Sequence, residues 1–228
     1  MNGNKREKPT ITAIEVFLYI PNLIGYVRVL FTSASLVMMT CWPSHWVLAI
    51  VMYVASFVMD LFDGMAARKF NQSSEYGGLL DMITDRCSTA GLLHILSHEY
   101  GEGQPRYRLL FLWLFVLDIS SHWCQMFSST RLALHHKSSS ANNGRFFLVR
   151  WYYQYYYFFG YCCVGAEFTY IALYVMSHIY TTSASLVLLN YVLMVFIPAC
   201  AMKQVVNIFQ LCSACYAVAE HDAKVKSQ

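Results

Sequence analysis

Residues 46–69 read WVLAIVMYVASFVMDLFDGMAARK, a mostly apolar run with two acidic residues near its end. A helix needs about 20 mostly apolar residues to cross the hydrocarbon core of a membrane. This run is long enough, and it closes on the basic pair Arg68 and Lys69. It therefore predicts a membrane-spanning helix that ends at a membrane surface and carries Asp60 and Asp63 inside it.

The rest of the chain has the same character. Hydrophobic residues make up 57% of the 228 residues and charged residues only 13%, against about 25% charged in soluble domains. We predict an all-α integral membrane protein with six transmembrane helices and a short interfacial helix over residues 12–19. The five further spans are expected at residues 23–40, 77–98, 107–126, 153–176 and 185–217. The net charge of +3 is small and dispersed, which argues against nucleic-acid binding.

Basic residues alternate between the connections. They are frequent in residues 1–10, 68–69, 131–150 and 224–226, and sparse in the other connections. Because cytosolic loops carry the excess of Lys and Arg, both termini are predicted to be cytosolic. Residues 1–15 are too polar for a signal peptide, so we expect an uncleaved anchor. We predict one domain, with residues 1–20 as a surface segment, 21–217 as the six-helix bundle and 218–228 as a cytosolic tail.

Acidic residues inside the apolar runs are the main functional signal. Each costs roughly 2.5–3.5 kcal/mol at the centre of a membrane helix, and such residues are usually functional. Six of the 13 acidic residues lie in the predicted spans: Asp60, Asp63, Asp81, Asp85, Asp118 and Glu167.

The last two acids have a structural interpretation. Asp118 and His122 lie four residues apart, one helical turn, and are predicted to form a buried hydrogen-bonded pair. Glu167 is predicted to face the bundle and to pair with a base such as Lys203.

The first four acids form two pairs with helical spacing. Asp60 and Asp63 are three residues apart, and Asp81 and Asp85 are four apart, so each pair shares one helix face. If the chain turns near residues 71–75, the two antiparallel helices place all four carboxylates at matching depths. Like charges that close repel unless cations lie between them. Hard divalent ions such as Mg²⁺ or Mn²⁺ suit a site made of carboxylates, and two ions balance four charges.

Two other interpretations compete with a metal-dependent enzyme. In the first, the acids form a self-neutralising network with Arg28, Arg68 and Arg86. Acids within a membrane also mark ion paths, so a cation transporter is an alternative. Transporter acids usually spread along a path, whereas these four gather at one end of their helices, which favours the enzyme.

The spacing matches a known signature. The chain reads Asp60-x-x-Asp63-Gly64-x-x-Ala67-Arg68, eight residues, Gly77, three residues, Asp81, three residues, Asp85. This resembles the signature of the CDP-alcohol phosphatidyltransferases at every defined position. Several stretches are similar to the eukaryotic phosphatidylinositol synthases within that family: PNLIGYVR at 21–28, AARKFNQ at 66–72, LLDMITDRCST at 79–89, SHW at 121–123 and HHKS at 135–138.

The resemblance implies roles for individual residues. Asp60 and Asp81 correspond to ligands that bridge two Mg²⁺ or Mn²⁺ ions. Asp63 corresponds to a ligand of the first ion, and Asp85 to a ligand of the second and to the general base. The positions of Gly64, Ala67, Arg68 and Ser74 correspond to those that hold CDP-diacylglycerol.

The resemblance also implies a reaction and a setting. The expected reaction transfers a phosphatidyl group from CDP-diacylglycerol to myo-inositol and releases CMP, in a homodimer of the endoplasmic reticulum or Golgi with the site facing the cytosol. The signature fixes the donor and not the acceptor, so glycerol-3-phosphate and serine remain alternatives. Arg131, His136 and Lys137 follow the fourth predicted span; they are candidates for the acceptor pocket or simply belong to a solvated basic loop.

Overall fold

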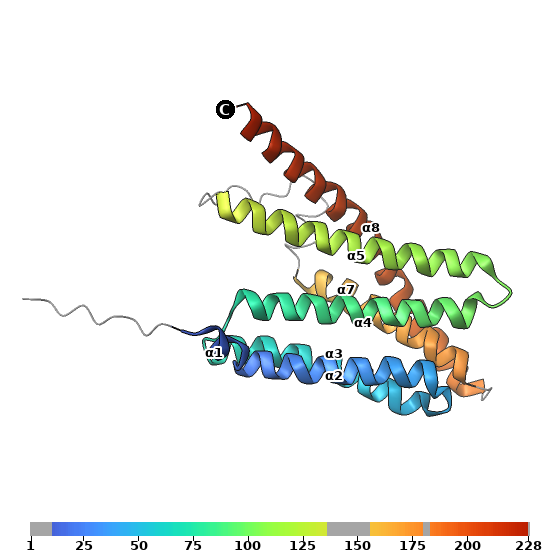
Figure 1. Ribbon diagram of the computed structural model, residues 1–228. Helices are drawn as coiled ribbons and strands as arrows, with labels where there is room; N and C mark the ends of the chain where they lie inside the picture. The colour runs from blue at the N-terminus through green and yellow to red at the C-terminus, as the bar shows by residue number, and fades with distance from the viewer. Residues whose placement is uncertain (1–10, 136–155, 180–182, 228) are drawn as a thin grey trace, which may run out of the picture. The chain divides into compact units, whose positions relative to one another are not determined.

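The structure is a computed structural model that describes residues 11–135, 156–179 and 183–227. Every regular element in these ranges is helical, which confirms the all-α prediction for them (Figure 1). The chain divides into two compact units, residues 1–88 and 89–228, and α4 runs from the first into the second. The elements are α1 (Ala13–Phe17), α2 (Ile20–Cys41), the 3-10 helix η1 (Pro43–His45), α3 (Trp46–Lys69), α4 (Glu75–Gly101), α5 (Pro105–His135), α7 (Tyr156–His178) and α8 (Ser183–Lys226).

Within the described residues, four stretches are long and apolar enough to cross a membrane: α2, η1 with α3, α5 and α8. Large apolar side chains stand exposed on them, such as Trp113 at 68% and Met194 at 75% of the maximal area. Such surfaces are unusual in water, so they indicate a multi-pass membrane protein. The helices α4 and α7 fall short of this criterion. Charged residues interrupt α4.

In the first unit, α2 and α3 lie side by side (Figure 1), and small polar side chains join them. The Thr32 and Ser56 hydroxyls lie 2.8 Å apart, and the Ser35 hydroxyl donates to the Ala49 carbonyl at 2.7 Å. Small residues let membrane helices approach closely, and each hydrogen bond between them contributes about 0.6 kcal/mol. The pairing fixes the register of α2 against α3, and with it the depth of the charged residues near their ends.

The helix α1 begins with a capping box. The Thr12 hydroxyl accepts from the Glu15 amide, and the Glu15 carboxylate accepts from the Thr12 amide at 2.7 Å. The bond from the Thr12 backbone lowers the pKa of Glu15 below its usual value. A short helix therefore does form within residues 12–19.

The turn between α3 and α4 lies where the sequence predicts it. Helix α3 ends at Lys69, and Asn71 follows with a φ of 55°, the left-handed conformation that ends many helices and that asparagine tolerates. The Ser74 hydroxyl then accepts from the Gly77 amide at 3.0 Å and caps α4. The Gln72 side chain accepts from the Ile20 amide at 2.9 Å, which ties this turn to the start of α2.

In the second unit, α8 packs against both α5 and α7. It spans 44 residues and contains Pro198, which membrane helices tolerate. Residues 218–226, predicted as a cytosolic tail after the last span, are helical and continue α8 to Lys226. A salt bridge of 3.3 Å between Glu220 and Lys224, one turn apart, supports this extension.

Candidate metal centre

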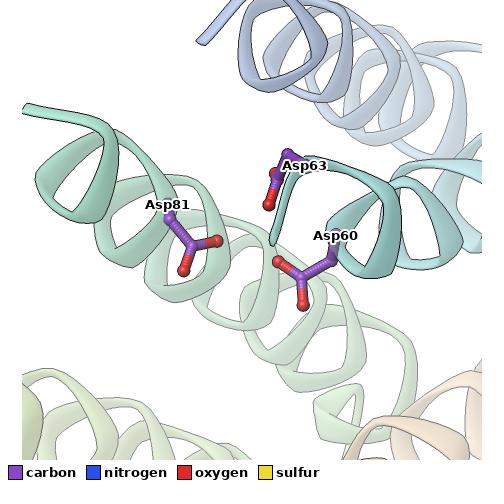
Figure 2. Close-up of side chains that lie close together, drawn as sticks. All are labelled: Asp60, Asp63 and Asp81. Atoms are coloured by element: carbon purple, nitrogen blue, oxygen red, sulfur yellow. The ribbon is translucent and has the colours of Figure 1, made fainter. Parts of the chain in front are cut away.

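Three aspartates converge in the first unit. Asp60 and Asp63 come from α3 and Asp81 from α4, and one carboxylate oxygen of each lies within 4.8 Å of the others. Figure 2 shows the three carboxylates turned toward a common point. The convergence follows from their spacing on two helices that are joined by a short turn.

The guanidinium of Arg28, from α2, lies among these carboxylates. Its Nη1 atom is 2.7 Å from Asp60 and Asp81 and 2.5 Å from Asp63. Its Nη2 atom is 2.7 Å from Asp85. All four predicted aspartates thus contact one cation, and we call these four aspartates the acidic centre.

The acidic centre has a buried side and a partly exposed side. The Arg28 side chain is 2% exposed and that of Asp63 14%, whereas those of Asp81 and Asp85 are 46% and 36% exposed. Arg86 lies 3.7 Å from Asp85 and adds a second positive charge. Two guanidinium groups against four carboxylates leave acid in excess, so the self-neutralising network is present only in part.

The donor set fits a hard divalent cation. Mg²⁺ binds oxygen ligands at about 2.1 Å, so opposite ligands lie about 4.2 Å apart. Carboxylate oxygens that already lie within 4.8 Å of one another need only small side-chain rotations to reach that spacing. The excess of acid and the pure oxygen chemistry favour Mg²⁺ or Mn²⁺.

A cavity of about 220 Å³ adjoins the acidic centre in the first unit. Asp63 and Asp81 lie in its wall, and the predicted lipid-site residues Gly64, Ala67 and Ser74 also line it. Asn22 and Gly25 of α2, which the sequence did not single out, contribute as well. Three of the four residues assigned to CDP-diacylglycerol by resemblance therefore share one cavity with two of the acids.

Arg68, the fourth, lines a different cavity. This second space of about 640 Å³ is bordered by Arg68 and Lys69 and by apolar side chains such as Ile20 and Phe62. The Arg68 guanidinium still approaches Gly64, with Nη1 3.6 Å from the place where a Cβ atom would stand. Two basic residues thus border a largely apolar cavity.

The two adjacent glycines of α4 are predicted to differ in their tolerance of alanine. A methyl group at Gly77 would meet the Asn22 side chain at 2.9 Å and the Ser74 hydroxyl at 3.2 Å, whereas one at Gly78 meets no atom within 4 Å. Alanine favours a helix over glycine by up to about 1 kcal/mol. Gly78→Ala should therefore keep or raise the thermal midpoint in detergent, and Gly77→Ala should lower it. Equal midpoints for the two variants would contradict this close contact.

The predicted acceptor residues lie elsewhere in the chain. Arg131 is exposed near the end of α5, with its guanidinium carbon 5.5 Å from the centre of the Phe127 ring. His136 and Lys137 lie outside the described residues. Their assignment to an acceptor pocket stays a prediction.

The second unit contains the other predicted acids. His122 Nδ1 lies 3.6 Å from the Asp118 carboxylate, so the two side chains are neighbours, but its 2.8 Å contact is with the Asp118 backbone carbonyl. His122 Nε2 lies 3.5 Å from the Lys203 amine. Glu167 is buried and accepts a short hydrogen bond from the Thr89 hydroxyl. A partner of Glu167 on α4 was not foreseen, because a threonine in an apolar run gives no distinctive signal.

The position of Arg28 at the acidic centre is the main feature of the site that was not predicted from the sequence. A buried arginine in an apolar span is a signal in itself, since such residues almost always pair. From the sequence, Arg28 is one of three arginines that are candidates to neutralise the acids. The structure places it at their centre.

These features define a membrane-embedded, acid-rich centre beside a cavity. The model of the CDP-alcohol phosphatidyltransferases matches residues 18–219, and the chain belongs to this family. The match includes all the residues of the acidic centre and of its cavity.

Several curated relatives are similar over almost the whole chain. CDP-diacylglycerol–inositol 3-phosphatidyltransferase 1 of Arabidopsis thaliana is 38% identical, over 92% of this chain and 92% of its own. The enzymes of the same name from Saccharomyces cerevisiae and Candida albicans are 35% and 34% identical, over 94% and 97% of this chain and 92% and 91% of theirs. No solved structure matches the chain significantly.

Proposed function

We propose that the chain is a CDP-diacylglycerol–inositol phosphatidyltransferase, which transfers the phosphatidyl group of CDP-diacylglycerol to myo-inositol and releases CMP. The observation that carries the proposal is the convergence of Asp60, Asp63 and Asp81 beside a cavity, in a chain similar over nearly its full length to relatives with this name. The acidic centre supports metal-assisted phosphoryl-group transfer, and the names of the relatives support inositol as the acceptor.

The donor lipid is proposed to lie across the two cavities of the first unit. The small residues Gly64 and Ala67 leave room for the cytidine diphosphate beside the acids, and Ser74 offers a hydroxyl. Arg68 and Lys69 stand beside the apolar cavity, which suits a phosphate attached to acyl chains. The acyl chains then remain among apolar side chains while the polar head reaches the acidic centre.

The four aspartates are proposed to have different roles in the reaction. Asp60 and Asp81 would each be a ligand to both of two divalent ions, Asp63 to the first and Asp85 to the second. When bound, such ions neutralise the diphosphate oxygens and stabilise charge on the leaving group. Asp85 takes the proton from the attacking inositol hydroxyl, whose oxygen forms a bond to the lipid-side phosphorus as the bond from that phosphorus to CMP breaks. Its exposed position, 36% accessible, suits an acceptor that arrives from water.

The setting of the site is proposed as well. We assign the two remaining spans to α4 and α7, which gives six spans and two cytosolic termini within a single domain. The acidic centre then faces the cytosol, where Arg131, His136 and Lys137 are available to an incoming polar alcohol. A homodimer in the endoplasmic reticulum or Golgi completes the proposal.

A test of the purified protein addresses both substrates. We expect CMP release from CDP-diacylglycerol only when Mg²⁺ or Mn²⁺ and an alcohol are both present, because the carboxylates need ions to receive the diphosphate. Labelled inositol should enter the lipid product, and unlabelled inositol should compete far better than glycerol-3-phosphate or serine. Preference for one of those alcohols would replace the acceptor and keep the mechanism. Cation flux without CMP release would instead support the transporter.

A further inference from the structure

We propose that the Arg28 side chain occupies the position of a divalent ion in the acidic centre, and that it has to withdraw before an ion can bind there. The proposal rests on the proposed function, since it takes the acidic centre to be a metal site. It assigns to Arg28 a positioning role rather than a catalytic one.

The distances place the guanidinium at the point where a metal ion would lie. Nη1 is within 2.7 Å of one oxygen of each of three carboxylates, and those carboxylates form the group whose oxygens lie within 4.8 Å of one another. An ion with the same three ligands would lie about 2.1 Å from each oxygen, in the space that this nitrogen fills. The Arg28 guanidinium and a divalent ion are both positively charged and repel each other. They therefore cannot occupy this position together.

The arginine satisfies the site incompletely. Nη1 carries two hydrogens for three carboxylates, and it donates hydrogen bonds to Asp63 and Asp81, while its contact with Asp60 is an ion pair. Among the described residues, its buried Nε finds no hydrogen-bond partner. A buried donor without a partner costs about 1–3 kcal/mol. The guanidinium therefore holds the position less well than an ion that all the carboxylates can ligate.

If the Arg28 side chain fills the metal position, two consequences follow. Without an ion, Arg28 keeps like-charged carboxylates together, so the apo site stays formed. With an ion, Arg28 acts as a competitor. If it fills the position nine-tenths of the time, the apparent affinity for the ion falls about tenfold.

The test replaces Arg28 by glutamine in the full-length protein. Binding of Mn²⁺, followed by electron paramagnetic resonance, should be about tenfold tighter in Arg28→Gln than in the wild type because the competitor is gone. The thermal midpoint in EDTA should fall below that of the wild type, because the repulsion between the carboxylates is no longer offset, and saturating Mn²⁺ should close most of the gap.

Arg86→Gln is the matched control. It removes the same charge 3.7 Å from Asp85 but vacates no metal position. It should change the Mn²⁺ affinity by less than about threefold, which corresponds to under 0.7 kcal/mol. Its thermal midpoint relative to the wild type should be the same with and without the ion.

Arg28→Gln that binds Mn²⁺ as weakly as the wild type, or more weakly, would overturn the proposal. If that variant does not fold, the wild type provides the measurement. In protein labelled with ¹⁵N-arginine, Mg²⁺ should shift the Arg28 guanidinium resonance, identified by its loss in Arg28→Lys, and an unshifted resonance would overturn the proposal. Absence of Mn²⁺ binding in the wild type and in Arg28→Gln would overturn the proposed function as well, whereas binding that is indifferent to Arg28 would overturn this inference alone.

Discussion

Asp85→Asn is expected to lower the rate of CMP release by at least about 100-fold, since a general base typically contributes 10²–10⁴-fold. The amide has almost the same shape as the carboxylate but cannot take a proton and ligates metal poorly. Its oxygen can still accept from Arg28 Nη2, which lies 2.7 Å from the Asp85 carboxylate. Expression and the elution position in size-exclusion chromatography should therefore match the wild type. The assay is initial-rate CMP release at saturating CDP-diacylglycerol, inositol and Mn²⁺.

The matched control is Glu99→Gln, which makes the same chemical change on the same helix. Glu99 is exposed and lies between three and four turns beyond Asp85 on α4. The control should retain the wild-type rate. A wild-type rate in Asp85→Asn would remove Asp85 from the role of base, and an equal loss in both variants would point to damage of α4 rather than to chemistry.

Removal of divalent metal is expected to abolish turnover completely and reversibly. Without ions, the acids of the centre repel the diphosphate of the donor instead of binding it, and the Arg28 guanidinium that lies between them offsets only part of their charge. Activity should vanish in excess EDTA and return on titration with free Mg²⁺ or Mn²⁺, and potassium at equal ionic strength should not restore it. Asp60→Asn, which weakens one predicted bridging ligand, should move the half-saturating metal concentration upward.

The fold should survive the loss of metal. Arg28 offsets part of the repulsion among the carboxylates, so EDTA should leave the elution profile of the wild-type protein unchanged. This control shows whether the divalent metal is needed for the reaction or for the fold. Full activity in EDTA, with the metal content measured to be below the enzyme concentration, would contradict the assignment of the acidic centre.

Much of the fold and of the site can be predicted from local patterns. Apolar runs of about 20 residues identify α2, α3, α5 and α8, and the turn after Lys69 is signalled by a polar stretch that begins at Asn71. Acids three and four residues apart on neighbouring antiparallel helices have to meet if their faces meet. Once those faces meet, the approach of Asp60, Asp63 and Asp81 follows from their spacing.

Other features depend on information that a pattern does not contain. The place of Arg28 depends on the register of α2 against α3, which the Thr32–Ser56 and Ser35–Ala49 contacts set. Spacing along one helix does not determine this register. The continuation of α8 to Lys226 is not predicted either, because the drop in hydropathy after residue 217 marks only the end of the apolar span. Such a drop shows where an apolar surface ends, and a helix continues while its polar side chains still favour it.

The contact between Thr32 and Ser56 has a consequence for how this chain diverges from its relatives. Each hydroxyl is buried and has the other within hydrogen-bond distance, in a medium that supplies no water to replace a lost partner. Loss of the Ser56 hydroxyl therefore removes this partner of the buried Thr32 hydroxyl, and a second substitution at position 32 can relieve the penalty, whereas Ser56 still donates to the Arg28 carbonyl when Thr32 is replaced. In evolutionary time, a change at position 56 should therefore favour a later change at position 32, although 24 residues separate the two along the chain.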